Sequence, residues 1–374
     1  MSETILEYYR KQGISTEHGV DEDWDKHIKR RKKLYRQLGI PVLAIKGSSI
    51  LEIGPGGGHN TLPMLTEWEA AHVDLAEPNE TARKELEEKF QNNCVPKDKY
   101  TIYSDALEEY QTSLKYDIVI AEGFLHAQKN WRKCLHTLSG LTHENSIVIV
   151  TCTDEISVYV EKMKRAVLRF LVKDVEGHKD KIEALKHIME PQLGSLRGMS
   201  RSVEDWIEDQ IFMPHAEEYM TIGKAIEYYE NDFDVLGASQ NIFVDYSWFK
   251  DYEYDYLTSY KKQYDEKKHM FLVAGDDNEV YRTAEENMQL EMAVLRANEA
   301  ARKVEEKALD IAELILMIQN VTHATVNPIV KKFNDEVISI IQRIAENRDI
   351  NWEEYKVYMG CFGKTMQYLS FIKK

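Results

Sequence analysis

Glycines crowd the stretch SSILEIGPGGGHNTLPML, residues 48–65, at the point where an apolar run ends and an amphipathic segment begins. Gly54, Gly56 and Gly58 alternate there, and Glu52 precedes them within the apolar run. Because glycine has no Cβ, a strand that ends in glycines and leads into a helix can bring its backbone into contact with a ligand. The stretch therefore predicts a binding loop for a small-molecule cofactor.

Two families of cofactor-binding proteins use such a loop, and the glycine spacing separates them. Dinucleotide enzymes have the pattern G-x-G-x-x-G, in which the third glycine lets the helix pack closely on the sheet. Counted from Gly54, that third position is His59, which disfavours a nicotinamide dehydrogenase. The acid in the strand and the alternate glycines resemble instead the first motif of class I S-adenosylmethionine (SAM) methyltransferases.

The resemblance extends over roughly residues 47–153 and implies further cofactor contacts. In that family an acid at the end of the second strand binds the ribose hydroxyls, and Glu77 in VDLAEPN matches it. Asp74 is the alternative, although side-chain alternation places it in the middle of the strand. An acid after the third strand contacts the adenine amino group, and Asp105 matches it, with Ala106 beside it.

The fourth motif of the family resembles YDIVIAEGFLHA, residues 116–127, which implies that Glu122 and Phe124 line the cofactor side. The form E-x-G-P-G-x-G-H-N of the first motif is similar to that of a bacterial subgroup associated with surface polysaccharides. This second resemblance concerns the acceptor rather than the cofactor.

Methyl transfer from SAM asks little of the protein, because the sulfonium already activates the methyl group. The site must align a nucleophile with that group and, for a hydroxyl, remove a proton. No metal is required. The candidate catalytic residues are His126, after the fourth predicted strand, and His215 in FMPHAEEY; a role in packing or at a helix start is the alternative for His126.

Candidate acceptor contacts lie in the segment that follows. Arg197 and Arg201, in GSLRGMSRS, are suited to gripping an anionic substrate, or else lie on the surface. Trp206 offers a face for a sugar or aromatic acceptor, with burial as the alternative. Asp205 lies one turn before Asp209, a spacing that fits a divalent ion or, more simply, a capped and solvated helix face.

Short apolar runs alternate with amphipathic segments and predict a Rossmann-like α/β sheet covered by helices on both faces. A helical lead precedes it, and Gly39 is a natural stop for that helix. The predicted strands are 49–53, 72–76, 100–104, 116–121, 146–152, 241–249 and 269–275, with a helical insertion before the last two.

Three regions follow from this pattern. Residues 1–46 form the helical lead, 47–277 the SAM-binding domain with a substrate lid at about 155–230, and 278–374 a C-terminal helical bundle. Apolar residues from Leu290 to Ile318 recur at steps of three and four, which predicts a coiled-coil-like seam. Further helices are expected from Asn327-Pro328 and from Asn351. Because so long an apolar stripe must be covered, we expect a bundle that folds back and also forms a homodimer.

Composition restricts the partners. The formal net charge of −16 disfavours a nucleic-acid-binding surface, and no stretch has the length of apolar residues that a membrane span needs. Four separated cysteines without C-x-x-C spacing, and an amino-terminal stretch without the layout of a secretory signal, favour a reducing cytoplasm.

The sequence therefore predicts a SAM-dependent methyltransferase that acts on an oxygen of a small-molecule or glycan-like acceptor. The alternative is a SAM-binding regulatory or scaffold protein in which catalysis is vestigial and the C-terminal helices carry the function.

Overall fold

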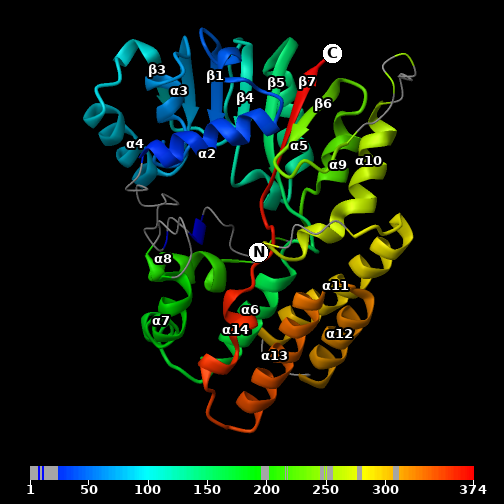
Figure 1. The fold of residues 1–374 in the computed structure, drawn as a ribbon. Helices are drawn as coiled ribbons and strands as arrows, with labels where there is room; N and C mark the ends of the chain where they lie inside the picture. Colours follow the sequence, from blue (N-terminus) through cyan, green and yellow to red (C-terminus); the bar gives the residue numbers. More distant parts are fainter. Residues whose placement is uncertain are drawn as a thin grey trace. The chain divides into compact units, whose positions relative to one another are not determined.

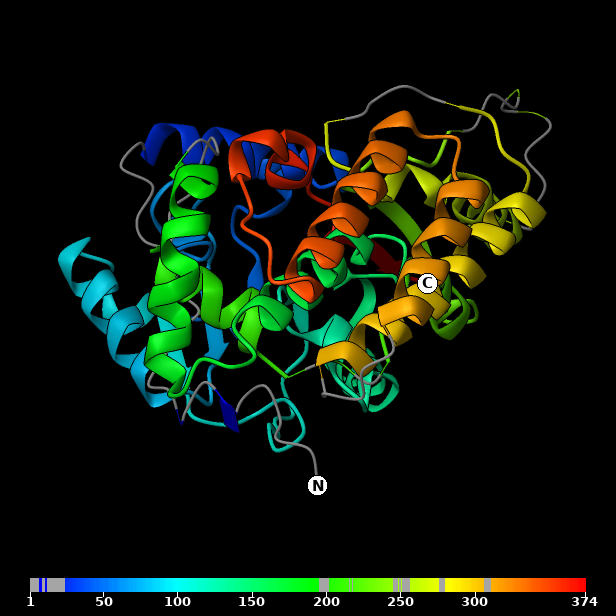
Figure 2. The ribbon, with the colours of Figure 1, turned by 90° about the horizontal axis from the view of Figure 1, so that it is seen from below.

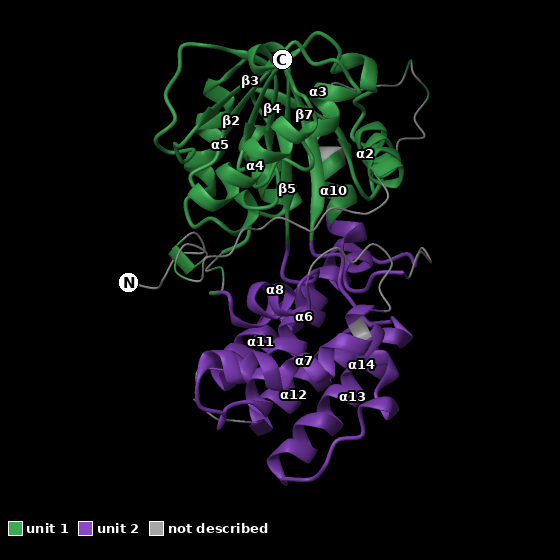
Figure 3. Ribbon diagram, turned by 90° about the vertical axis from the view of Figure 1, so that its left-hand side faces the viewer, with its two compact units in different colours: residues 1–153, 214–264, 366–374 green, residues 154–213, 265–365 purple. Residues whose placement is uncertain are grey.

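The chain divides into two compact units (Figure 3). The computed structural model describes residues 7–8, 11, 24–194, 202–214, 216, 218–244, 248, 250, 256–275, 280–305 and 311–374. Unit 1 comprises residues 1–153, 214–264 and 366–374, and unit 2 comprises residues 154–213 and 265–365. These units do not coincide with the predicted regions, because residues 154–213 group with the C-terminal helices and 366–374 with the sheet. The assignment of functions to the predicted ranges 1–46, 47–277 and 278–374 remains a prediction.

A seven-stranded sheet of order β3-β2-β1-β4-β5-β7-β6 forms the centre of unit 1 (Figure 1). The strands are β1 Ser49–Ile53, β2 His72–Ala76, β3 Tyr100–Tyr103, β4 Tyr116–Ala121, β5 Thr142–Cys152, β6 Phe233–Ala238 and β7 Gln367–Lys373. The first five pair in parallel, whereas β7 runs antiparallel to both β5 and β6. The predicted Rossmann-like α/β fold is confirmed, including the helical insertion before the last two strands.

Helices cover both faces of this sheet. Two successive side chains of β7, which point to opposite faces, contact the two layers of helices. Ser370 donates from Oγ to the carbonyl of Leu38 at 2.7 Å on one face, in the region of α2 (Trp24–Gln37), α3 (Leu62–Thr66) and α4 (Glu80–Asn92). The neighbouring Phe371 contacts the ring of Tyr229 at 5.0 Å on the other face. Tyr229 ends α9 (Ile222–Tyr229) and donates to the Leu135 carbonyl of α5 (Trp131–Gly140) at 2.9 Å.

The predictions of strands at 241–249 and at 269–275 are wrong. The described residues of 241–249 form no strand, and His269 lies in a 3₁₀ helix, Lys268–Phe271. Leu272 and Val273 are buried in the core of unit 2 instead, and Phe271 is buried beside them in the chain. A short apolar run has the same pattern whether it is a strand or a buried irregular segment, so periodicity alone does not separate the two.

Two other segments, β6 and β7, complete the sheet. The residues of β7 were predicted to belong to the C-terminal helical bundle. The helix expected from Asn351 is only a 3₁₀ turn, Trp352–Glu354, followed by α14, Lys356–Gly360. The bundle prediction for 278–374 is therefore wrong over 367–373. Those residues pair along their length with β5 and β6, which satisfies their backbone groups inside the sheet.

Unit 2 is helical. Its helices are α6 Tyr159–Leu171, α7 His178–Gly194, α8 Val203–Ile207, a π-helix Glu208–Phe212, α11 Ala284–Glu305, α12 Ile311–Ala324, α13 Pro328–Ala345 and α14; α10 Tyr256–Lys267 lies across the boundary between the two units. The helix expected from Asn327-Pro328 is α13, and Asn327 caps it by accepting from the amides of Ile329 and Val330.

The apolar seam lies on two helices rather than one. Leu290, Val294 and Ala297 are fully buried on α11, and Ile318 is fully buried on α12. Helices α11, α12 and α13 lie side by side, and α11 and α13 also pack on α6 (Figures 1 and 2). The seam is therefore covered within the chain.

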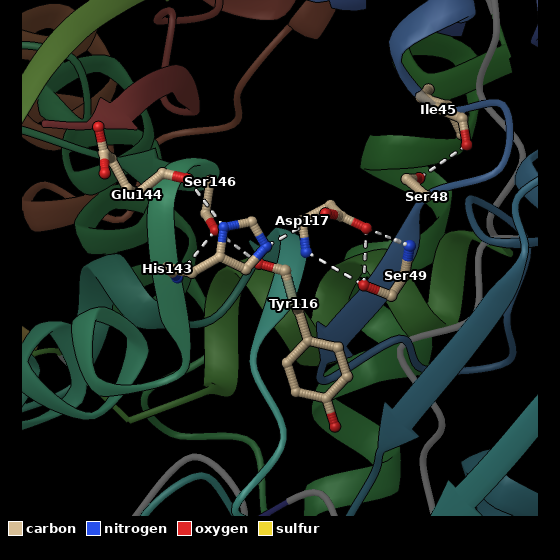
Figure 4. Close-up of polar contacts among 8 residues, drawn as sticks. All are labelled: Ile45, Ser48, Ser49, Tyr116, Asp117, His143, Glu144 and Ser146. Atoms are coloured by element: carbon tan, nitrogen blue, oxygen red, sulfur yellow. Dashed lines mark hydrogen bonds and ion pairs between the residues drawn. The ribbon is translucent and has the colours of Figure 1, made fainter.

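A polar network fixes the amino-terminal ends of three neighbouring strands (Figure 4). The Asp117 carboxylate accepts from the amide and from the hydroxyl of Ser49, both at 2.7 Å, and faces His143 Nε2 at 3.2 Å. Ser146 donates to the Tyr116 carbonyl at 2.7 Å. Burial alone would raise the pKa of Asp117, but the hydrogen bonds from Ser49 and His143 lower it. These bonds hold β1, β4 and β5 in register.

We expect Asp117→Ala to lower the free energy of unfolding by about 1–2 kcal/mol, because the amide of Ser49 loses a charged acceptor. The loss should shrink as the pH falls, since the lowered pKa means that Asp117 stabilises the fold only while ionised. Urea denaturation at several pH values measures both effects. Glu144→Ala is the control, because Glu144 enters this network only through its carbonyl; equal effects of the two substitutions would contradict the prediction.

Candidate functional site

The glycine loop lies at the carboxyl-terminal edge of the parallel strands. Gly54, Gly56 and Gly58 have φ values of 68°, 57° and 77°, which L side chains rarely adopt. A Cβ on Gly54 would lie 3.0 Å from the ring of Phe124, and one on Gly58 would lie 3.0 Å from Leu86. The loop thus needs glycine both for its backbone conformation and for its close packing.

Glu77 closes one side of this loop. It follows β2, and its carboxylate accepts from the Gly56 amide at 3.0 Å and from the Asn79 amide at 2.8 Å. The rival residue, Asp74, lies within β2 and accepts from the Tyr116 hydroxyl at 2.6 Å. Glu77 therefore lies at the strand edge beside the glycine loop, whereas Asp74 is committed to a bond inside the fold.

Glu52 fastens the other end of the loop. Its buried carboxylate accepts from Thr61 Oγ1 at 2.5 Å, and Thr61 is the residue before α3. Burial raises the pKa of Glu52 to about 7, and the nearby Glu122 carboxylate contributes to that shift. Near neutral pH this group is therefore only partly ionised.

Glu122 is held by an arginine that sequence reasoning did not select. Arg31 on α2 donates to the two carboxylate oxygens of Glu122 at 2.9 and 3.0 Å, and both side chains are buried. The predicted place of Glu122 at the end of β4 is observed, but its two oxygens are bonded to Arg31. The signal in the sequence was weak, because Arg31 lies in the basic run KRRKK, where charged residues are usually solvated.

The remaining predicted residues of unit 1 lie after the ends of neighbouring strands. Asp105 and Ala106 follow β3, and Phe124 follows β4 and packs on Gly54. His126 lies in the 3₁₀ helix Leu125–Ala127, with Nδ1 at 3.3 Å from Thr151 Oγ1 on β5. In a parallel sheet these ends meet at one edge, and the strand order reverses between β1 and β4.

None of the residues predicted to contact the acceptor is among the described residues of unit 1. Arg197, Arg201 and His215 lie outside the described residues. Asp205 and Trp206 lie on α8 in unit 2, where Ser202 caps the helix by accepting from the Asp205 amide at 3.1 Å and Trp206 packs on an apolar cluster. The capping and packing alternatives are thus observed for this helix. Within the described ranges, no group of three or more His, Cys, Asp or Glu residues is arranged to hold a metal ion, and no helix is long and apolar enough to cross a membrane.

Residues 24–191 match the family model described as a methyltransferase domain. A comparison with curated proteins gave no match. Similar solved structures include PKMT2 from Rickettsia typhi in complex with AdoHcy, with 15% identity over 60% of this chain and 46% of that chain and a TM-score of 0.43. A putative sarcosine dimethylglycine methyltransferase from Galdieria sulphuraria has 10% identity over 98% of this chain and 96% of that one, with a TM-score of 0.40.

This chain spans about half the length of the PKMT2 structures that it resembles. The family match begins in α2 and ends in α7, so it covers the parallel strands of the sheet and continues into unit 2.

The raised pKa of Glu52 predicts a pH dependence of stability. Between about 4.5, its ordinary value, and about 7, the folded chain keeps a proton that the unfolded chain releases, so stability falls as the pH rises through this window. We expect Glu52→Gln, which still accepts from Thr61, to remove this fall and to be more stable than the wild type above pH 7, by up to about 3 kcal/mol.

Urea denaturation from about pH 4.5 to about pH 8 measures this difference. Glu109→Gln, at an exposed position in the same unit, is the control. Parallel pH profiles for the wild type and Glu52→Gln would show that Glu52 is not the group responsible.

Proposed function

We propose that the whole chain is a SAM-dependent methyltransferase that methylates an oxygen of a small-molecule or glycan-like acceptor. The observation that carries this proposal is the bond from the Gly56 amide to Glu77, which sets a carboxylate beside a glycine loop at the edge where the strand order reverses.

Each residue at this edge has a proposed role. Glu77 binds the ribose hydroxyls, since each carboxylate oxygen can accept more than one hydrogen bond. Asp105 and Ala106 contact the adenine. Gly54, Gly56 and Gly58 admit the cofactor close to the backbone, and Glu52 acts through Thr61 by holding the loop. Glu122 acts by anchoring the end of β4 to Arg31.

His126 is the proposed general base. Its ring lies after β4 at the same edge, and Thr151 Oγ1 lies 3.3 Å from Nδ1, which orients the ring. Histidine titrates near neutral pH and so suits removal of a hydroxyl proton during in-line attack on the methyl group. This role supports an oxygen acceptor. Arg197, Arg201, Asp205, Trp206 and His215 stay predictions as acceptor residues, as does the cytoplasmic location.

The activity is tested by incubating the purified chain with SAM and a cell extract and measuring S-adenosylhomocysteine. Formation that depends on the extract supports the enzyme. SAM binding without any turnover would favour the scaffold alternative.

Glu77→Ala should weaken SAM binding by about 1.5–3 kcal/mol, or roughly 10- to 150-fold, because it removes the ribose acceptor and the bond to Gly56. Calorimetry measures the affinity, and the melting temperature shows whether the variant is folded. Asp74→Asn is the matched control, since an amide oxygen can still accept from Tyr116. Unchanged affinity in a folded Glu77→Ala variant, with a loss in Asp74→Asn, would overturn the assignment.

We also propose that the chain forms a homodimer through α11. The buried seam cannot supply this interface, but Met288, Met292 and Leu295 are 55%, 48% and 39% exposed on that helix. Their spacing of four and three places them on one face, where an apolar stripe favours association with a second copy.

Light scattering tests the dimer. We expect Met288→Lys/Met292→Lys to convert a dimer to a monomer, because four lysines would meet across the interface, whereas Leu43→Lys in unit 1, at an exposed leucine, should leave it intact. A full-length chain that is already monomeric at micromolar concentration would reject the proposal. A truncation at residue 277 would be a poor test, since it also removes β7 from the sheet.

A further inference from the structure

A cavity of about 360 Å³ lies within unit 2 and is lined by residues of α6, α7, the π-helix and the end of α11. Its size falls in the range of small-molecule sites. The lining residues are Arg169, Phe170, Val172, Lys173, Gly177, His178, Lys181, Phe212, Val304 and Glu305. They are separate from the residues proposed to bind SAM, all of which belong to unit 1.

The lining carries an excess of positive charge in a chain whose formal net charge is −16. Arg169, Lys173 and Lys181 are cationic, and Glu305 is the one carboxylate among the lining residues, which leaves an excess of two positive charges when His178 is neutral. Glu305 is shared by two arginines, since Arg165 Nε and Arg169 Nη1 donate to it at 2.9 and 3.0 Å. Its charge is therefore already balanced within the unit.

The two lysines are the cations best placed to receive a ligand. Arg169 is fixed in the wall, because it also donates to the carbonyls of Ile211 and Phe212 at 2.7 and 3.1 Å. Lys173 follows α6 and is 38% exposed, and its Nζ lies 3.7 Å from the carboxylate of the exposed Asp174, a long ion pair. Lys181 lies one turn into α7, on the same side as His178.

An aromatic wall adjoins these cations, formed by the rings of Phe212 and His178, which meet edge to face. The ring of Phe212 lies 5.6 Å from the Arg169 guanidinium and 5.0 Å from the ring of His178. His178 Nε2 is in turn held 2.8 Å from Glu208 on the π-helix. Phe170 and Val304 are largely buried and also line the cavity. Such a wall favours a ring or another flat apolar group, whereas the lysines favour an anion.

We propose that this cavity binds a small phosphate monoester that carries a ring, with its phosphate on Lys173 and Lys181 and its ring against Phe212. The proposal concerns binding in unit 2 and does not depend on SAM binding or on methyl transfer.

Phenyl phosphate is the probe, and calorimetry on the full chain measures its affinity. We expect saturable binding that is tighter than that of inorganic phosphate or of phenol, because only phenyl phosphate uses both the lysines and the aromatic wall. Binding should weaken as salt is added, since it depends on exposed charges.

The test substitution is Lys173→Gln/Lys181→Gln, which should weaken phenyl phosphate binding tenfold or more. The matched control is Lys179→Gln/Lys331→Gln, which removes the same charge from exposed positions outside the cavity and should bind like the wild type. The melting temperature shows that both variants are folded.

Absence of saturable phenyl phosphate binding to the wild type would overturn the proposal. Equal losses in the two lysine pairs would overturn it as well, because they would indicate a general charge effect. Failure of SAM to bind would bear on the proposed function alone.

Discussion

The buried ion pair between Arg31 and Glu122 is the interaction on which the arrangement of the cofactor edge depends. Burial alone would lower the pKa of Arg31, but its interactions with the Glu122 carboxylate, together with Tyr35 and Tyr368, more than offset this and raise that pKa. Removing one partner from such a pair costs about 3–5 kcal/mol, because the other charge is left buried and unpaired. The pair thereby fixes α2 against the end of β4, next to Phe124 and the glycine loop.

Around this pair, carboxylates at one edge of the sheet have different tasks. Glu122 anchors a helix, Glu52 holds the end of the glycine loop through Thr61, and Glu77 accepts from the loop and is proposed to bind the cofactor. Burial, with a contribution from the nearby Glu122 carboxylate, raises the pKa of Glu52 to about 7, so the loop is held by a carboxyl that is partly protonated near neutrality. At the opposite edge, Asp117 fixes the register of β1 against β4, which sets the positions from which these groups extend.

Unit 2 is held together by a helical core. The apolar positions of α11 and α12 bury one another, and α11 contacts α6. The helix α6 of the insertion therefore shares one core with the C-terminal helices, although more than a hundred residues separate α6 from α11 in the chain. The same close packing leaves two features at its surface that the core does not explain: a cationic cavity and an apolar stripe on α11.

The sequence by itself determined the first five strands, the glycine loop, the carboxylate within β1 and those that follow β2 and β4, because glycine spacing and side-chain alternation are local signals. It also indicated the cap of α8, where one side chain bonds a nearby amide, and the start of α13 at Asn327-Pro328. Only the tertiary structure decided which late segments complete the sheet, since 367–373 becomes a central strand through pairing with β5 and β6. It likewise decided that Arg31, rather than another residue of its basic run, is buried on Glu122, because that choice depends on a partner 91 positions away.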